Sequence, residues 1–182
     1  GACPGICAEV VVTDCTEAAL RSALFDHGTD VTVTFPSNCS ITISQPLDVS
    51  SASTTVIDAA GHTVSISGGS GTRIFNVSGS LALVGLTLKN GNSDAGGAIR
   101  VDAGVTLMAT NCVLQSNVAT GTNGGAGTDG KDAAYGSAGD GGSGGNGSLG
   151  QGGAIYYVGT VGLARCSLAT NSATGGYGGD GG

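Results

Sequence analysis

Residues 96–99 read Gly-Gly-Ala-Ile, and residues 112–121 read Cys-Val-Leu-Gln-Ser-Asn-Val-Ala-Thr-Gly. The same order returns as Gly-Gly-Ala-Ile at 152–155 and Cys-Ser-Leu-Ala-Thr-Asn-Ser-Ala-Thr-Gly at 166–175. The two Gly-Gly-Ala-Ile motifs lie 56 residues apart, whereas the two segments that begin with Cys lie 54 residues apart. The two copies therefore differ by a two-residue insertion. Repetition at such a distance indicates one supersecondary unit stacked on its own copy.

Short runs of alternating apolar and polar residues fill the chain around these repeats, for example at 31–35, 41–43, 64–66 and 86–88. Gly, Asn, Asp or Pro stands at most of their ends, which is typical of strands joined by turns. Helical stretches are missing between them, which excludes βαβ units. The sequence predicts an all-β fold, a right-handed single-stranded parallel β-helix over residues 30–182.

Aligning the coils predicts four interior ladders. They are Ile57, Ile74, Ile99 and Ile155; Leu83, Leu107 and Leu163; Leu86, Cys112 and Cys166; and Leu88, Leu114 and Leu168. The alignment places the two-residue insertion in a turn at about residues 108–111. Cys112 and Cys166 are expected to be buried thiols in adjacent layers, because a free Cys behaves as a small hydrophobe. Asn117 and Asn171 occupy matching turns, and we expect them to form an asparagine ladder.

The first 29 residues are predicted to form a cap on the solenoid. Asp14 precedes Glu17 by three positions, as in a capping box, and apolar residues follow at helical spacing. The predicted helix covers about residues 14–27, and Gly28 is placed to end it. A solenoid needs such a lid, because its first layer would otherwise present an apolar end and an open strand edge.

Four of the six cysteines lie in the first 39 residues: Cys3, Cys7, Cys15 and Cys39. They are candidates for disulfides in an oxidising compartment, which predicts a secreted, extracellular or cell-surface protein. The favoured pairing is Cys15 with Cys39 and Cys3 with Cys7, although six cysteines allow other pairings. A zinc site using Cys3, Cys7 and His27 is the alternative, and it lacks the second ligand pair that such sites usually present.

The composition excludes several classes of partner. Thirteen acidic and six dispersed basic residues give a net charge of −7, so no basic face can neutralise phosphates and we expect no nucleic acid partner. No apolar run approaches the roughly 20 residues that cross a bilayer, so no transmembrane segment is expected. Aromatic residues make up 4% and Trp is absent, which favours thin layers of aliphatic side chains.

A glycine-rich insertion occupies residues 121–151 and contains thirteen glycines, and residues 175–182 begin a tail of the same kind. This composition permits either a flexible excursion or tightly packed polyproline-type strands. Calcium binding by the acidic residues of these segments is an alternative. However, these residues are not arranged in the nonapeptide calcium-binding repeat, and we interpret them as solvated side chains. These acids are Asp129, Asp132, Asp140 and Asp180.

The two repeats resemble those of polymorphic outer membrane proteins, in which Gly-Gly-Ala-Ile is followed by Phe-x-x-Asn. Residues 114–117 and 168–171 match the second half with Leu in place of Phe. Residues 15–24 look like the capped opening of secreted bacterial β-helix proteins. The resemblance implies a right-handed β-helix at a cell surface, where such proteins serve as adhesins, autotransporter passengers and surface layers.

Candidate catalytic groups are scattered along the sequence. Asp58 and Asp102 are isolated in their coils, and neither His27 nor His62 has a Ser or Cys at a recognisable spacing. No catalytic residue, cofactor or metal site is therefore predicted, and the chain is not expected to be an enzyme. The predicted function is a self-associating structural protein, a filament or surface-layer subunit that stacks head to tail. The alternatives are an adhesin that binds a glycan or host protein, and a polysaccharide lyase or hydrolase.

Overall fold

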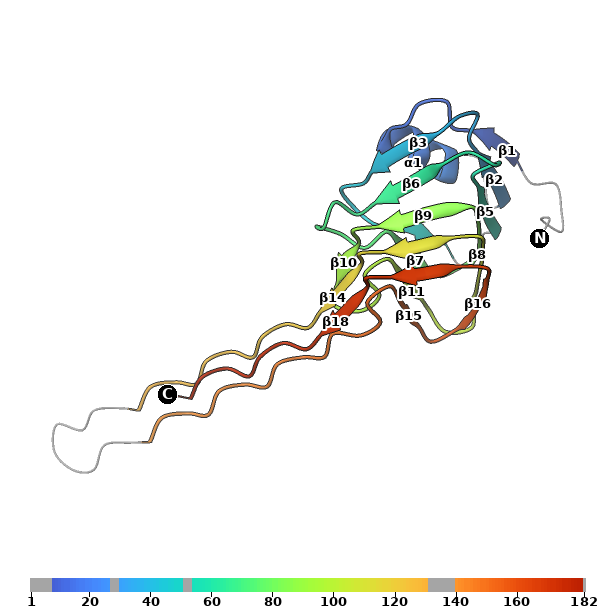
Figure 1. The fold of residues 1–182 in the computed structure, drawn as a ribbon. Helices are drawn as coiled ribbons and strands as arrows, with labels where there is room; N and C mark the ends of the chain where they lie inside the picture. The colour runs from blue at the N-terminus through green and yellow to red at the C-terminus, as the bar shows by residue number, and fades with distance from the viewer. Residues whose placement is uncertain (1–7, 27–29, 51–53, 131–139, 182) are drawn as a thin grey trace.

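The computed structural model describes residues 8–26, 30–50, 54–130 and 140–181. Within these residues, parallel strands stack into a β-solenoid of about four turns, with one short helix at its N-terminal end (Figure 1). The predicted fold class, an all-β parallel solenoid, is confirmed.

Four parallel sheets, here called A to D, run along the solenoid. Sheet A contains β1 (Ala8–Val11), β2 (Asp30–Thr34), β5 (Thr54–Asp58), β8 (Ser80–Val84), β12 (Thr106–Thr110) and β16 (Thr160–Ala164). Sheet B contains β3 (Cys39–Thr42), β6 (Val64–Ser67), β9 (Leu86–Lys89), β13 (Val113–Gln115) and β17 (Ser167–Ala169). Sheet C contains β4 (Leu47–Val49), β7 (Phe75–Val77), β11 (Ile99–Val101) and β15 (Ile155–Tyr157). Sheet D contains β10 (Asn92–Ser93), β14 (Val118–Thr120) and β18 (Ser172–Thr174).

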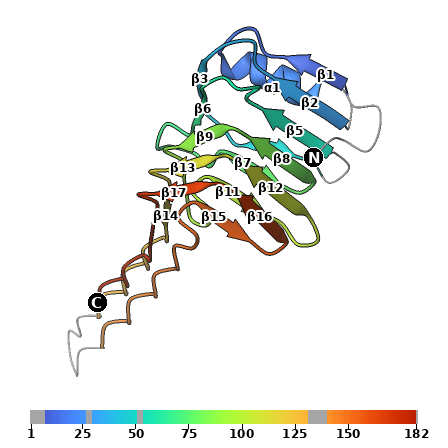
Figure 2. The same ribbon diagram turned by 45° about the vertical axis from the view of Figure 1, so that its right-hand side comes forward.

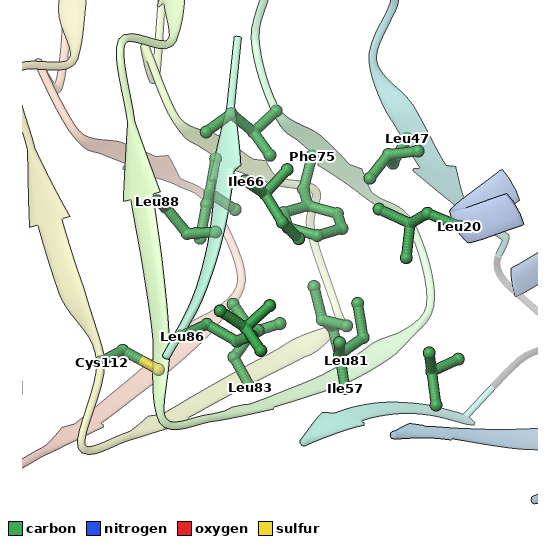
Figure 3. Close-up of a cluster of buried hydrophobic side chains, with 14 of the residues drawn as sticks. Leu20, Leu47, Ile57, Ile66, Phe75, Leu81, Leu83, Leu86, Leu88 and Cys112 are labelled. Atoms are coloured by element: carbon green, nitrogen blue, oxygen red, sulfur yellow. The ribbon is translucent and has the colours of Figure 1, made fainter. Parts of the chain in front are cut away.

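The core fills the space that the sheets enclose. Side chains alternate between interior and surface along strands such as β2, in which Val31 and Val33 are buried while Thr32 and Thr34 are partly exposed. Figure 3 shows aliphatic side chains such as Leu83 and Leu88 packed together with Phe75 in this interior. Each fully buried Leu, Ile or Phe stabilises the fold by about 1.5–3 kcal/mol relative to its exposed state, so these ladders supply the driving force for stacking.

Two of the four predicted ladders follow the observed register. Leu88 pairs with Leu114, and Leu114 pairs with Leu168. Cys112 and Cys166 directly precede the paired strands β13 and β17, and the Cys112 backbone N–H lies 3.4 Å from the Cys166 sulfur. Leucine and cysteine positions in the repeats are therefore aligned in adjacent turns.

The other two ladders are correct only in part: Ile99 does pair with Ile155, and Leu83 and Leu163 both pair with Ala109. Ile57 pairs with Leu83 in sheet A, whereas Ile99 pairs with Phe75 and Ile155 in sheet C. Ile74 precedes Phe75 and is out of step with Ile99 by one position. The prediction matched isoleucine with isoleucine, but the register follows from the direction of each side chain and not from its type.

The predicted position of the two-residue insertion is also wrong, because it depended on the placement of Leu107. Leu107 pairs with Leu81 and Val161, not with Leu83 and Leu163. Because Val101 pairs with Tyr157 and Thr106 with Thr160, the first copy has two extra residues between these pairs, in the turn at 102–105. The prediction of residues 108–111 is corrected accordingly, since those residues lie in or directly after β12.

The N-terminal cap contains α1 (Glu17–Phe25). Its N-cap is Thr16, whose side chain accepts a hydrogen bond from the Ala19 backbone N–H, so the predicted start at Asp14 is wrong. Thr16 is still extended, with φ −123° and ψ 155°, which is the conformation that a capping residue adopts. The helix buries Leu20 and neighbouring apolar residues against the first turn of the solenoid.

Polar contacts and a disulfide attach the cap to the first turn. Glu17 accepts hydrogen bonds from the backbone N–H and hydroxyl of Ser44, both at 2.9 Å, and pairs with Arg21. Partial burial acts to raise the pKa of the Glu17 carboxyl, but the hydrogen bonds from Arg21 and Ser44 outweigh it, and the pKa is lowered. Cys15 and Cys39 form a disulfide, whereas the predicted Cys3–Cys7 pair and the proposed zinc ligand His27 lie outside the described residues.

The glycine-rich segments form an arm that projects from one corner of the solenoid (Figures 1 and 2). We name its extended segments strand I (121–130), strand II (140–151) and strand III (174–181). Their backbones are joined at every third residue: Gly121 and Gly124 of strand I donate to strand III, and Gly176 and Gly179 of strand III donate to strand II. Strand II in turn donates to strand I, so each strand contacts both others.

This period of three explains the glycine content of the arm. A Cβ on Gly124 would lie 1.9 Å from the Gly145 carbonyl oxygen, and one on Gly179 would lie 1.9 Å from that of Gly125. Only glycine allows extended strands to approach so closely, as in other packed polyproline-type assemblies. Of the two predicted conformations, the described residues adopt the packed one.

Candidate functional site

The lower face of the last described turn is a surface feature that could carry a function. We call it the uncovered face: it is a hollow of about 430 Å³ at the end of the solenoid opposite α1, and it presents interior side chains of β15, β16 and β17. Its lining comprises Gly153, Ala154, Ile155, Tyr157, Val161, Leu163, Leu168, Thr170 and Asn171. No described residue covers this face, so the apolar side chains and the outer edges of these strands meet solvent.

The Gly-Gly-Ala-Ile motif shapes the corner at which each repeat enters sheet C. Gly96 has φ +69° and Gly152 has φ +61°, a left-handed conformation that glycine adopts without strain. A Cβ on Gly97 would lie 2.4 Å from the Gly153 carbonyl oxygen, so the two corners stack in close backbone contact. The motif is therefore a packing element of the coil.

The two predicted ladder asparagines lie one above the other. Asn117 is fully buried; its side chain accepts from the Gly91 N–H at 2.8 Å and donates to the Leu88 carbonyl and to the Asn171 side-chain oxygen. Asn171 donates to the Leu114 carbonyl at 2.9 Å. Each side chain thus joins its own turn to the turn before it, and Asn171 borders the uncovered face.

The two repeat cysteines are free thiols. Cys112 is buried between turns, whereas Cys166, in the last described turn, is partly exposed. Burial raises the pKa of the Cys112 thiol.

The second surface feature is a polar groove on the outer face of sheet C. It has a volume of about 330 Å³ and is lined by Asp48, Arg73, Asn76, Ser78, Arg100 and Asp102. Three of these side chains form one column across the sheet, because Asp48 pairs with Asn76 and Asn76 with Arg100. We call this feature the sheet C groove.

Hydrogen bonds hold the groove in one arrangement. Asn76 donates to Asp48 at 2.6 Å and accepts from Arg73 at 2.7 Å. Ser78 donates to Asp102 at 2.7 Å, and the Nε of Arg100 lies 3.4 Å from the same carboxylate. The lining groups are therefore positioned before any ligand arrives.

Arg73 links the groove to the turn that precedes β11. Its guanidinium donates to the Gly96 and Ala95 carbonyls and to Ser93, and it pairs with Asp94 at 3.2 Å. Burial lowers the pKa of Arg73, and the nearby Asp94 opposes this shift. The hydrogen bond from the Ser93 hydroxyl lowers the pKa of Asp94. Arg73 is thus held in place as a structural cation at the corner before β11.

Asp102 stands alone in the sequence, and the structure shows which polar groups it contacts. Asp102 contacts Ser78 and Arg100, and Asp94 contacts Arg73, although these partners are up to 24 residues apart. The groove was missed because its residues come from three coils. In sheet C, each of Asp48, Asn76 and Arg100 directly follows the buried residue that aligns the strand with its neighbours. This pattern could have revealed the column of polar side chains, but the isoleucine ladder was predicted with residues from two different sheets.

The remaining candidates do not converge. His62 lies in the turn between β5 and β6, with its backbone bonded to Ala59, and Asp58 bonds the backbone of Ala60. On the arm, Asp129, Asp140 and Asp180 are exposed, whereas Asp132 lies outside the described residues. Within the described ranges, no three His, Cys, Asp or Glu side chains are grouped so that they could hold a metal ion.

No family model matches the sequence, and comparison with curated proteins and with solved structures returned no match. The likeness to polymorphic outer membrane repeats therefore rests on the motif residues alone. No helix among the described residues is long and apolar enough to cross a membrane.

Proposed function

We propose that this chain is a non-enzymatic, extracellular structural protein whose copies associate head to tail through the uncovered face. The observation that carries the proposal is the exposure of interior side chains on that face: Leu163 is 41% exposed and Leu168 is 51% exposed. Fully burying an exposed leucine contributes about 1.5–3 kcal/mol, so covering each of these half-exposed side chains contributes about half of that, and the face favours a covering partner.

A second copy supplies a matching surface at its other end. There β1 forms the outer edge of sheet A, and Val11 and Phe25 are 49% and 45% exposed. Placing β1 of one copy beside β16 of the next would continue sheet A and pair backbone groups at the usual spacing of about 4.8 Å. Such a contact joins two different surfaces, so it propagates as a filament unless the rotation closes a ring.

We also propose that the protein is secreted and that its repeats are related to those of polymorphic outer membrane proteins. The Cys15–Cys39 disulfide is compatible with an oxidising compartment. The partly exposed Cys166 would be protected by a neighbouring copy. The motif resemblance adds surface-layer subunits and adhesins as precedents for a solenoid without a catalytic centre.

Sedimentation velocity and negative-stain microscopy of residues 1–182 test the proposal. We expect oligomers that grow with concentration and appear as filaments. The Leu168→Lys variant should remain monomeric, because a charge then occupies the buried contact. The Leu149→Lys variant is the matched control, since Leu149 is 72% exposed and lies on the arm, outside the lining of the uncovered face. A monodisperse monomer at high concentration, or unchanged association of Leu168→Lys, would contradict the proposal.

A further inference from the structure

We propose that the sheet C groove is a binding site for a neutral oligosaccharide. This site is separate from the uncovered face and goes beyond the structural function proposed above. The inference rests on the groove's volume of about 330 Å³, on its mixture of hydrogen-bond donors and acceptors, and on the balance of its charges.

The charge balance indicates a neutral ligand. The lining contains two guanidinium groups and two carboxylates, and Arg73 is further paired with Asp94 outside the lining. The groove and its surroundings thus carry no excess of positive charge with which to bind a uronate, sulfate or phosphate group. Sugar hydroxyls both donate and accept, which suits a site that offers carboxylate acceptors beside amide and guanidinium donors.

Unused hydrogen-bonding capacity points outward from the groove. Arg100 is half exposed, and among the described residues its two terminal amino groups have no hydrogen-bond partner. Asp48 is exposed and accepts from Asn76 through one oxygen, which leaves the other for a ligand. These two residues lie on either side of Asn76 in the register of sheet C, so a ligand that crosses the strands can reach both.

The groove is also rigid and has an aromatic neighbour. Every lining side chain stands on or beside a strand of sheet C, and hydrogen bonds already hold Asn76 and Asp102, so these two side chains lose little conformational entropy on binding. Tyr156 pairs with Arg100 and continues the same column on β15, where its ring can pack against the apolar face of a sugar. The ligand is therefore expected to extend from Asp48 toward Tyr156.

The test is a calorimetric titration of the wild-type chain with two sets of oligosaccharides. The neutral set contains oligomers of glucose, mannose, galactose and N-acetylglucosamine; the acidic set contains oligomers of galacturonic acid and sulfated galactose. We expect at least one neutral oligomer to bind saturably with a Kd below about 1 mM, and acidic oligomers to bind more weakly. Tyr156→Ala should weaken this binding, because it removes the ring that packs against the apolar face of the sugar.

Two conservative variants and one control assign the binding to the groove. Arg100→Gln and Asp48→Asn should each weaken it about tenfold or more, because each removes a charge-assisted hydrogen bond. Lys89→Gln removes a charge from the outer face of sheet B and should bind like the wild type, and circular dichroism verifies that all variants fold. The proposal is overturned if no neutral oligomer saturates, if acidic oligomers bind more tightly, or if Arg100→Gln and Asp48→Asn retain full affinity. Association through the uncovered face is measured separately, so failure of either proposal leaves the other intact.

Discussion

The two copies of the repeat have nearly the same sequence pattern but different surroundings. Leu114 of the first copy is completely buried, whereas its partner Leu168 in the second copy is 51% exposed. Asn117 and Cys112 are likewise buried, while Asn171 and Cys166 are partly exposed. The motif therefore specifies the path of a coil, and the neighbouring coils decide how much each residue contributes to stability.

The largest expected difference concerns the paired leucines. Leu114→Ala should lower the free energy of unfolding by about 3 kcal/mol, because it opens a cavity between two turns. Leu168→Ala should cost less than about 1 kcal/mol in the monomer, since half of that side chain already meets water. Urea unfolding of both variants at low protein concentration measures the difference. Equal losses would contradict the assignment of Leu168 to an uncovered face.

The asparagine ladder should give a smaller difference in the same direction. Asn117→Ala leaves the buried Gly91 N–H and Leu88 carbonyl without their side-chain partner, which should cost about 2 kcal/mol. Asn171→Ala should cost about half as much, because water can reach its site. Gln115→Ala, on the outer face of β13, is the control and should change the unfolding free energy by less than about 0.5 kcal/mol. A loss for Asn171→Ala that exceeds the loss for Asn117→Ala would refute this account of the ladder.

The cysteine pair compares the two environments by chemical reactivity. Cys166 should react with iodoacetamide at least about tenfold faster than Cys112, which must wait for an opening of the solenoid. The raised pKa of Cys112 further reduces its thiolate fraction at neutral pH. Peptide mass spectrometry after timed alkylation gives both rates in one sample. Similar rates would mean that Cys112 is not held between turns.

The smallest expected effect on stability comes from the N-terminal cap, at the end of the solenoid opposite the uncovered face. The pKa of Glu17 is lowered in the folded chain, so its contribution is present above the unfolded value of 4.5 and is lost as the pH falls through the folded pKa. Because the pair with Arg21 is partly exposed, we expect a loss of less than about 1 kcal/mol. Thermal unfolding from pH 6 to pH 3 should show this loss in the wild type and not in Glu17→Gln. An identical acid dependence in Glu17→Gln would show that the cap does not depend on this carboxylate.

Sequence alone predicted the solenoid because alternation and repetition are local signals. It also aligned Leu88 with Leu114, since the repeat motif runs directly through these residues. It failed for Leu107 and Ile57, where strands of similar composition permit more than one register. The sheet C groove could not be predicted without the correct register, because its side chains meet only when three coils are stacked.

The central claim is that a second copy covers the last turn, and hydrogen exchange tests it most directly. Deuterium uptake should be followed for peptides that contain β13 and β17 at low and at high protein concentration. The account predicts that β13 amides are protected at both concentrations, whereas β17 amides exchange rapidly when dilute and become protected when concentrated. If uptake by β17 does not change with concentration, the uncovered face does not bind another copy, and the claim is contradicted.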